Sequence, residues 1–510
     1  PTTPCGIDLI TDGPAQVRAL SSSVSTSAVS LEFSAGMTNP PVAGDAFTAD
    51  IRVGSVRNTT GGAVSLVARG DIAVGSIDTD ATGAGGNWAA GNVEVRSTAG
   101  TLQIGSITAR GASAPGAQAG RGGDITLEGV QQAGGGAAIV VQEAVITAGG
   151  NGAFEQDGGD AGDITVTLHA AADGSAGVLQ LENPPSGPGL AFVPVSEASG
   201  LQSLGGTGGD TFATEAGNGG NGGNITIRSG TPTGAIRVDA TSGAQVVSDA
   251  GEGGSDASGT LGVLGAGGNA GLIDIQGGDV TLDGGLYASL TRNTSAGMRI
   301  AADADTGAVR LNNGATLVVA GHDPGLPSVS AAQCADCELS LQAGAGGVSQ
   351  TGEALIVTPT LALDVGGGGD VTLEGAHALG QVHGSVAGDL SLTLGFNSDD
   401  PQNLSLGATS GSGSTSTSLG LDVGGNLTVT SSDFAFVPVH IAAAVQVGEQ
   451  ATFNAPGTFS IASNASLQAG TAVSFVAQGG MLLSPETHEA APDSSNEQLT
   501  LNSDEIERIT

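Results

Sequence analysis

A short phrase recurs along the chain: Gly, then Asp or Asn, then three residues in the order apolar, polar, apolar. Alternation of this kind predicts a short β-strand with one buried face. The Gly and the acidic or amide residue before it predict a left-handed backbone turn into each strand. Copies of the phrase lie at residues 70–74, 91–95, 123–127, 162–166, 223–227, 278–282, 369–373, 388–392 and 425–429.

Short strands repeated this often predict a solenoid, because no single coil can bury its own apolar face. Stacked coils would bury continuous columns of Val, Ile and Leu, with a rise of about 4.8 Å per coil. The expected fold class is therefore all-β, a β-solenoid with Gly-rich loop insertions. Its expected parts are N-terminal strands (1–60), coils with long Gly-rich insertions (61–310), coils with shorter turns (311–490) and a C-terminal segment that continues into a further coil or contacts a neighbouring copy (491–510).

The Gly-rich insertions come mostly just before a copy of the strand phrase, so we expect them at one corner of successive coils. They carry acidic residues, among them Asp157, Asp160 and Glu215. Two interpretations stay open: tolerated solvent loops, or a surface for lateral contacts or ion binding. The insertions are residues 81–90, 111–122, 149–161, 205–223 and 251–271.

Composition narrows the function classes. The chain has 510 residues, 50 acidic against 13 basic, and all of the basic residues are Arg. A formal net charge of −37 excludes nucleic acid as a partner, since binding to phosphates requires a positive field. Aromatic residues make up 3% of the chain, which is too few for a large core of packed rings. No apolar run is long enough to span a membrane as a helix.

Three cysteines are present. Cys334 and Cys337 form a C-A-D-C pair, and Cys5 stands near the start. A zinc site needs about four ligands, and a redox pair is expected beside a βαβ pattern, which is missing. We therefore predict a disulfide between Cys334 and Cys337 that closes a turn before a strand at 338–341. Free thiols, or a metal or redox role, are the alternatives.

Two stretches resemble a known family. One is the phrase G-G-N-I-T-I behind a G-N-G-G-N-G tract (217–227), and the other is the dense run of strand phrases at 361–392. Both are similar to large exoproteins of the filamentous haemagglutinin type, a family of secreted bacterial adhesins. The resemblance implies a right-handed parallel β-helix, and an extracellular rod at the bacterial cell surface that adheres to surfaces or to copies of itself. Residues 499–510 are similar to a phrase that leads into another coil in such proteins, so the chain is expected to be part of a longer one.

An enzyme is the weaker interpretation. Polysaccharide lyases and hydrolases with a β-helix fold need clustered carboxylates beside a basic residue. The adjacent pair Asp399 and Asp400 has no Arg near it in sequence, and the six His are scattered. We therefore predict a protein that is not an enzyme.

No cofactor is required by the sequence, and calcium is the one candidate. Residues 205–213 match the nonapeptide calcium repeat loosely, and Asp recurs at one coil position, where stacking would place like charges about 5 Å apart. Bound Ca²⁺ would relieve that repulsion; alternatively, each Asp accepts backbone N–H groups of its own turn. The candidate ligands are Asp163, Asp210, Asp370 and Asp389.

These observations predict an extracellular structural protein, either a cell-surface or matrix filament or an adhesin stalk. The alternatives are a calcium-dependent adhesin that binds glycans of a host or neighbouring cell, and a β-helix polysaccharide lyase or hydrolase. The expected partners are other copies of the chain, end to end or side by side, and surface glycans.

Overall fold

The computed structural model describes residues 7–11, 17–18, 24–26, 31–35, 50–58, 61–82, 89–113, 119–134, 136–182, 199–211, 215–240, 243–255, 265–290, 296–312, 314–321, 337–395, 404–410, 417–431, 439–454, 459–462 and 465–475. Its elements are all β-strands, and these residues contain no helix, so none that could cross a membrane. The all-β prediction is confirmed. The chain divides into two compact units, each described by itself: Pro1–Gly277 with Leu282–Gly297, and Gly278–Thr281 with Met298–Thr510.

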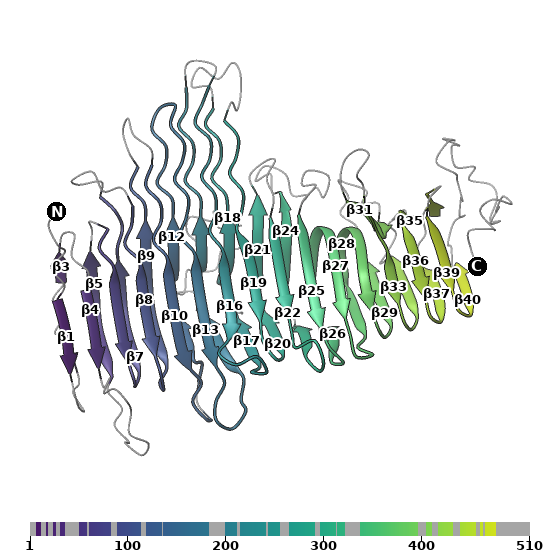
Figure 1. Ribbon diagram of the computed structural model, residues 1–510, viewed down its shortest axis with the longest axis horizontal. Coiled ribbons are helices and arrows are strands. Elements are labelled where there is room, and N and C mark those ends of the chain that lie inside the picture. Colours follow the sequence, from purple (N-terminus) through teal and green to yellow (C-terminus); the bar gives the residue numbers. More distant parts are fainter. Residues whose placement is uncertain are drawn as a thin grey trace. The chain divides into compact units, whose positions relative to one another are not determined.

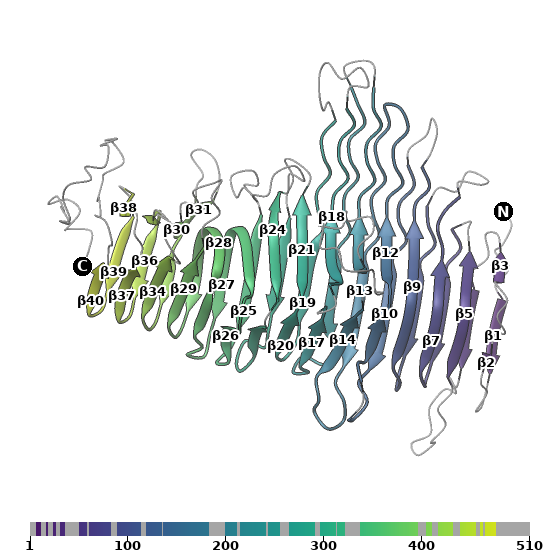
Figure 2. The same cartoon turned by 180° about the vertical axis from the view of Figure 1, so that it is seen from behind.

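In the first unit the chain returns to the same column of strands once per coil, and neighbours in a column pair in parallel (Figures 1 and 2). The first column is β1 (Ile7–Thr11), β4 (Leu31–Ala35), β6 (Val64–Ala68), β8 (Val93–Ser97), β10 (Ile125–Val130), β13 (Ile164–His169), β16 (Ile225–Ser229) and β19 (Leu272–Gln276).

The second and third columns share their early strands. β5 (Ile51–Asn58), β7 (Ile72–Asp78) and β9 (Leu102–Arg110) each pass through both columns. The second also contains β2 (Val17–Arg18), β11 (Ile139–Val141), β14 (Gly177–Leu181) and β17 (Ile236–Asp239). The third also contains β3 (Val24–Thr26), β12 (Ala144–Ala148), β15 (Gly200–Leu204), β18 (Gln245–Asp249) and β21 (Gly285–Leu290).

Register explains the core. The first apolar residue of each strand phrase pairs with the equivalent residue of the next coil, and each is at most 2% exposed. Burial therefore follows the alternation read from the sequence, and stacked aliphatic side chains replace a core of rings. One such stack consists of Val64, Val93, Ile125, Ile164, Ile225 and Ile273.

The second unit repeats the arrangement with longer strands. β27 (Leu355–Val365) and β28 (Val371–Val386) pass through several columns. A stack of Val371, Leu390, Leu427 and Ala451 is fully buried. The remaining strands are β22 (Gly297–Ala301), β23 (Ala308–Leu311), β24 (Thr316–Gly321), β25 (Glu338–Ala343), β26 (Gly347–Gln350), β29 (Leu390–Leu394), β30 (Leu404–Leu406), β33 (Leu421–Val423), β34 (Leu427–Ser431), β35 (Val439–Ile441), β36 (Ala444–Val447), β37 (Gln450–Asn454), β38 (Phe459–Ile461), β39 (Ser466–Ala469) and β40 (Ala472–Phe475).

Two features interrupt this regularity. β31 (Ala408–Ser410) and β32 (Thr417–Leu419) form a small antiparallel pair. β20 (Val280–Asp283) and β22 (Gly297–Ala301) each contain residues of both units. The predicted boundaries at residues 60, 310 and 490 stay predictions, and the segment 491–510 lies outside the described residues.

Candidate functional site: a glycine-rich plate

Between the third column and the next first column, successive coils of the first unit extend into Gly-rich segments that rise side by side from the strands (Figures 1 and 2). Each segment has an outgoing leg and a returning leg, and we name the whole array the plate. Its outgoing legs are residues 109–113, 148–154, 204–211 and 249–255. Its returning legs are residues 119–124, 156–163, 215–224 and 265–271.

A repeat of three residues organises the hydrogen bonds of the plate, as the returning leg 215–224 illustrates. The N–H of Gly219 donates to Ala266 O of the next coil at 2.8 Å. The N–H of Gly220 crosses to the outgoing layer and donates to Gly206 O at 2.7 Å. The N–H of Asn221 donates to Asp160 Oδ1 of the preceding coil at 2.8 Å. Three successive residues therefore donate in three different directions.

The outgoing layer follows the same rule. Gly205 donates to Asp249 O of the next coil at 2.9 Å, and Gly206 donates across the layers to Gly159 O at 2.9 Å. Thr207 donates to Asn151 Oδ1 of the preceding coil at 3.1 Å. The repeated order Gly, Gly, polar residue thus assigns one hydrogen-bond direction to each position.

Glycine is required here by close approach. A Cβ placed on Gly220 would lie 2.0 Å from Gly159 O, and one on Gly206 would lie 2.0 Å from Gly150 O. Neither residue has a positive φ, and neither do the Gly residues that open the strand phrase at 123, 162 and 223. The expectation of left-handed turns at these positions was therefore wrong: the glycines let backbones of adjacent legs and coils touch.

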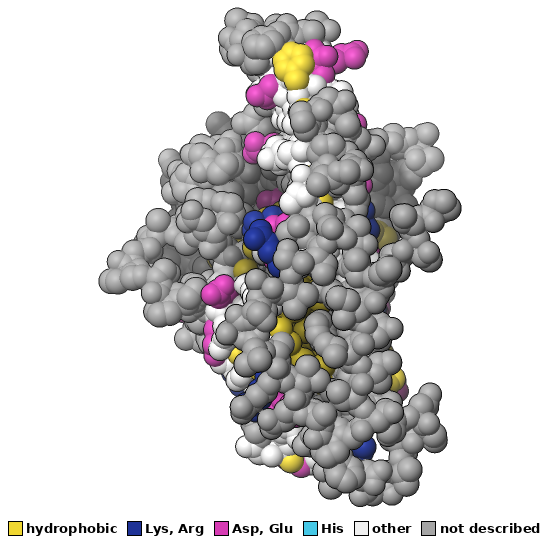
Figure 3. All heavy atoms as spheres, turned by 90° about the vertical axis from the view of Figure 1, so that its left-hand side faces the viewer, with side chains coloured by type: hydrophobic (Ala, Val, Ile, Leu, Met, Phe, Trp, Pro, Cys, Tyr) yellow, Lys and Arg dark blue, Asp and Glu magenta, His cyan; other side chains and the backbone are white. Residues whose placement is uncertain are grey.

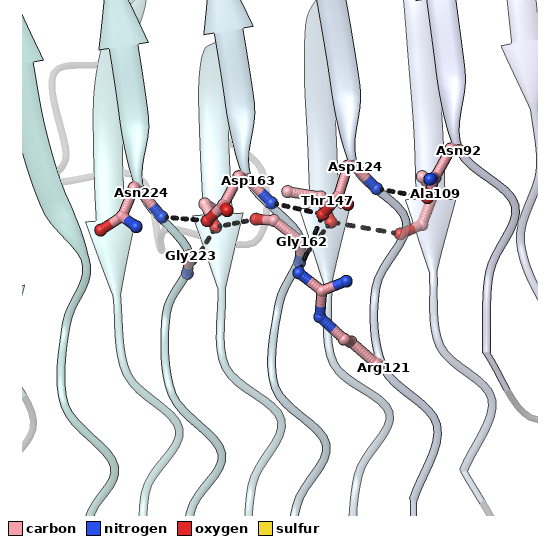
Figure 4. A network of polar contacts seen from close by, with 10 residues as sticks. Asn92, Ala109, Arg121, Asp124, Thr147, Gly162, Asp163, Gly223 and Asn224 are labelled. Carbon is pink, nitrogen blue, oxygen red and sulfur yellow. Dashed lines mark hydrogen bonds and ion pairs between the residues drawn. The ribbon is translucent and has the colours of Figure 1, made fainter.

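Asp and Asn form ladders on the returning layer. Asn92 Oδ1 accepts the N–H of Asp124 at 2.9 Å, and Asp124 Oδ1 accepts the N–H of Asp163 at 3.0 Å. Asp163 Oδ1 accepts the N–H of Asn224 at 2.7 Å (Figure 4). Asn224 Oδ1 in turn accepts the N–H of Leu272 at 2.8 Å. Each side chain therefore bonds the next coil, and the expectation that such Asp residues bond their own turn was wrong.

Buried hydroxyls fix the base of the plate. Ser203 Oγ accepts the N–H of Gly223 at 2.8 Å and donates to Gly162 O at 2.9 Å. The side chains at this position are fully buried, and each joins the end of the third column to a returning leg, as Figure 4 shows for Thr147. The series is Thr147, Ser203 and Ser248.

The second unit carries a separate ladder. Asp370 Oδ1 accepts the N–H of Asp389 at 2.8 Å, and Asp389 Oδ1 accepts the N–H of Asn426 at 2.7 Å. The Asn426 side-chain amide donates to Asp389 Oδ1 at 3.1 Å and to Glu449 Oε2 at 3.0 Å. This ladder lies among shorter turns, so a ladder of Asp and Asn also forms where no Gly-rich legs extend from the strands.

The calcium candidates are placed as follows. Asp163 lies on the returning layer and Asp210 on the outgoing layer. Asp210 Oδ1 accepts the N–H of Ser255 at 2.8 Å and the Ser255 hydroxyl at 3.0 Å. Asp370 and Asp389 are neighbours in the ladder of the second unit. The part of the chain that the structure describes holds no group of three or more His, Cys, Asp or Glu arranged to bind a metal ion. Calcium binding stays a prediction.

A hollow of about 390 Å³ lies on the returning layer. Its lining combines carboxylate, amide and guanidinium groups, and the Arg121 guanidinium is held by Asp124 at 2.9 Å. These groups can hydrogen-bond a polar molecule. The lining residues are Ala119, Arg121, Asp157, Asp160, Asn218, Asn221 and the glycines at 158, 159, 219 and 220.

Other candidates from the sequence stand apart from the plate. Cys337 is buried and disulfide-bonded, while Cys334 lies outside the described residues, so their pairing stays a prediction. The pair Asp399 and Asp400 also lies outside them. His377 was not singled out as a core residue, yet it is fully buried, and burial lowers its pKa to about 4.

The comparisons with known proteins add no relative: no family model, no curated protein and no solved structure matches this chain.

Proposed function

We propose that this chain is a right-handed parallel β-helix that serves as an extracellular structural protein, a section of a surface filament or adhesin stalk, and that it is not an enzyme. The observation that carries the proposal is the repeated parallel pairing of strands in register from coil to coil among the described residues of each unit. In such stacking each coil contacts only its neighbours, which is the arrangement of elongated repeat proteins.

The use of polar side chains supports the same proposal. A catalytic pair would be drawn from the carboxylate and amide side chains of the chain. In the ladders, one side-chain oxygen of each Asp or Asn accepts a backbone N–H group of the next coil. Hydrogen bonds of this kind stabilise the repeat and hold the carboxylates in fixed rows. These polar side chains therefore have a structural role in the described coils.

The negative charge of the chain supports the proposal that its surface faces solvent. The chain has a formal net charge of −37, and acidic side chains recur along the plate in the view of Figure 3. Repulsion between like charges keeps such surfaces apart at low ionic strength. Secretion to the bacterial cell surface, and partners such as further copies of the chain or surface glycans, are proposed on the resemblance to filamentous haemagglutinin-type exoproteins.

Electron microscopy of the purified full chain tests the proposal. We expect narrow particles whose length greatly exceeds their width, and surface labelling of intact cells by an antibody against the chain. A compact, nearly spherical particle, or labelling only after lysis, would contradict it.

A further inference from the structure

The hollow on the returning layer combines polar side chains from three successive coils. Arg121 belongs to the first of these coils, Asp157 and Asp160 to the second, and Asn218 and Asn221 to the third. All five side chains are exposed, and the described residues of the lining include no aromatic or large aliphatic side chain. Whatever occupies the hollow is therefore held by hydrogen bonds.

The backbone of the next coil fixes how each Asp and Asn is turned. Asp157 Oδ1 accepts the N–H of Asn218 at 2.7 Å, and Asp160 Oδ1 accepts the N–H of Asn221 at 2.8 Å. The Oδ1 atoms of Asn218 and Asn221 accept N–H groups of the following coil at 3.0 and 2.9 Å. One oxygen of every side chain is thus held by the ladder, and its second polar atom is left for other contacts.

These second atoms are acceptors on one coil and donors on the next. Among the described residues, Oδ2 of Asp157 and Oδ2 of Asp160 accept no hydrogen bond, and Nδ2 of Asn218 donates none. The Asn221 amide lies beside the Asp row, since its Nδ2 donates to Asp160 Oδ1 at 3.0 Å. Arg121 uses one terminal nitrogen on Asp124 at 2.9 Å, and its guanidinium has five N–H groups in all.

This arrangement selects a neutral ligand. Calcium takes about six to eight oxygen ligands, whereas the hollow offers two carboxylates beside a guanidinium, with both amide oxygens already bonded. An anion would be repelled by the carboxylates of Asp157 and Asp160. Hydroxyl groups both donate and accept, so a molecule that carries several of them can satisfy the carboxylates and the N–H groups together.

We propose that the hollow binds a neutral saccharide. Its hydroxyl groups donate to Oδ2 of Asp157 and of Asp160, and accept from the amide of Asn218 and the guanidinium of Arg121. An acceptor and a donor on neighbouring coils suit two adjacent hydroxyl groups of one sugar ring. The volume of about 390 Å³ lies at the lower end of the range for small-molecule sites, about 300–1,000 Å³, which suits a short saccharide.

This inference rests on the proposed function for a glycan as partner, and adds the place where it binds and its neutral class. A peptide also offers N–H and carbonyl groups. It fits less well, because recognition of an extended peptide uses pockets for its side chains, and the lining is polar throughout.

An array of neutral oligosaccharides, acidic oligosaccharides and unstructured peptides, probed with the fluorescently labelled full chain, tests the proposal. We expect saturable binding to neutral oligosaccharides and weaker or no binding to the other two classes. Binding that favours acidic oligosaccharides or peptides, or no binding at all, would overturn it. Microscopy of particle shape and surface labelling report on the filament separately, so a failure of either proposal can be told from a failure of the other.

Two substitutions that preserve shape locate the site. Asp157→Asn keeps an oxygen for the N–H of Asn218 but replaces the free acceptor by an N–H₂ group. Asn218→Asp keeps the oxygen that accepts from the following coil but replaces the free donor by a second carboxylate. By isothermal titration calorimetry with the neutral oligosaccharide that binds most strongly on the array, each should lower affinity by about tenfold or more, because a hydrogen bond to a charged group, or a donor, is lost.

The matched control is Asp163→Asn, which makes the same change in the same ladder outside the lining of the hollow. Its affinity for the oligosaccharide should equal that of the natural chain, and all three variants should melt at nearly the same temperature as the natural chain. Unchanged affinity in folded Asp157→Asn and Asn218→Asp would refute the proposal. An equal loss of affinity in Asp157→Asn and Asp163→Asn would refute it as well, since binding would then follow the charge of the layer and not the hollow.

Discussion

Gly220 and Gly206 lie against each other on the two legs of one plate segment, and the N–H of Gly220 donates to the carbonyl oxygen of Gly206 at 2.7 Å. The contact joins the returning layer to the outgoing layer without any intervening side chain. Backbone hydrogen bonds therefore join the two layers of the plate, and its stability depends on the absence of a Cβ at these glycines.

Replacing Gly220 by Ala should open the plate. The new Cβ would lie 2.0 Å from Gly159 O, and backbone cannot yield as a flexible side chain would. We expect a loss of about 1–3 kcal/mol, the usual range for overpacking, concentrated in the plate. Urea unfolding and limited proteolysis measure it.

The matched control is Gly136→Ala. No atom lies within 4 Å of a Cβ at Gly136, and its φ is not positive. The control should resist protease like the natural chain. Equal sensitivity of both variants would show that the close contact in the plate is not what matters.

Removal of a buried hydroxyl should also weaken the plate. Ser203→Ala leaves the N–H of Gly223 and the carbonyl of Gly162 without their partner in a fully buried position. We expect a destabilisation of about 1–3 kcal/mol in chemical denaturation. Ser76→Ala removes a partly exposed hydroxyl and should cost little; a similar loss in both variants would count against the relay at the plate base.

Acid should destabilise the second unit through His377. Burial lowers the pKa of its imidazole to about 4, from 6.5 in the unfolded chain, and Nδ1 accepts the N–H of Ile356 at 3.0 Å. The unfolded state therefore binds more protons between these values. Stability is fully present above pH 6.5 and falls as the pH is lowered towards 4.

Thermal denaturation between pH 7 and pH 4 checks this dependence, with His377→Gln as the comparison. The glutamine variant loses the titrating group and should show a smaller change across the same range. A variant that keeps the full pH dependence would assign it to other groups.

Chelation tests the predicted calcium bridging. If Ca²⁺ links acidic faces of separate copies, a chelator should lower light scattering by assemblies while the circular dichroism signal of the β-strands persists. Loss of that signal would instead make the ion part of the fold. No change in either measurement would remove calcium from the account.

The sequence predicted the strands well and the plate poorly, for a physical reason. The alternation of apolar and polar residues at 164–166 identifies the buried face of a strand directly, because apolar side chains lie on one face and polar side chains on the other. Gly-rich legs carry no such contrast, and their three-residue period reads as low complexity until the neighbouring coil is placed beside it. The partner of Asp163 is a backbone group of residue 224, and only the register between coils reveals it. The burial of His377 could not be predicted, because a single His within a strand pattern does not indicate which face of the strand it occupies.

The hydrogen bonds of Asn side chains in the plate also affect the rate at which these residues deamidate. Asn followed by Gly is prone to deamidation, in which the glycine nitrogen attacks the side-chain carbonyl carbon, ammonia leaves, and water later opens the cyclic imide. At Asn218 both reacting groups are occupied on the next leg: the N–H of Gly219 donates to Ala266 O, and Asn218 Oδ1 accepts the N–H of Ala266 at 3.0 Å. An intact plate should therefore keep its amides over long exposure, whereas Gly220→Ala should accumulate isoaspartate at this step, and mass spectrometry of stored samples distinguishes the two.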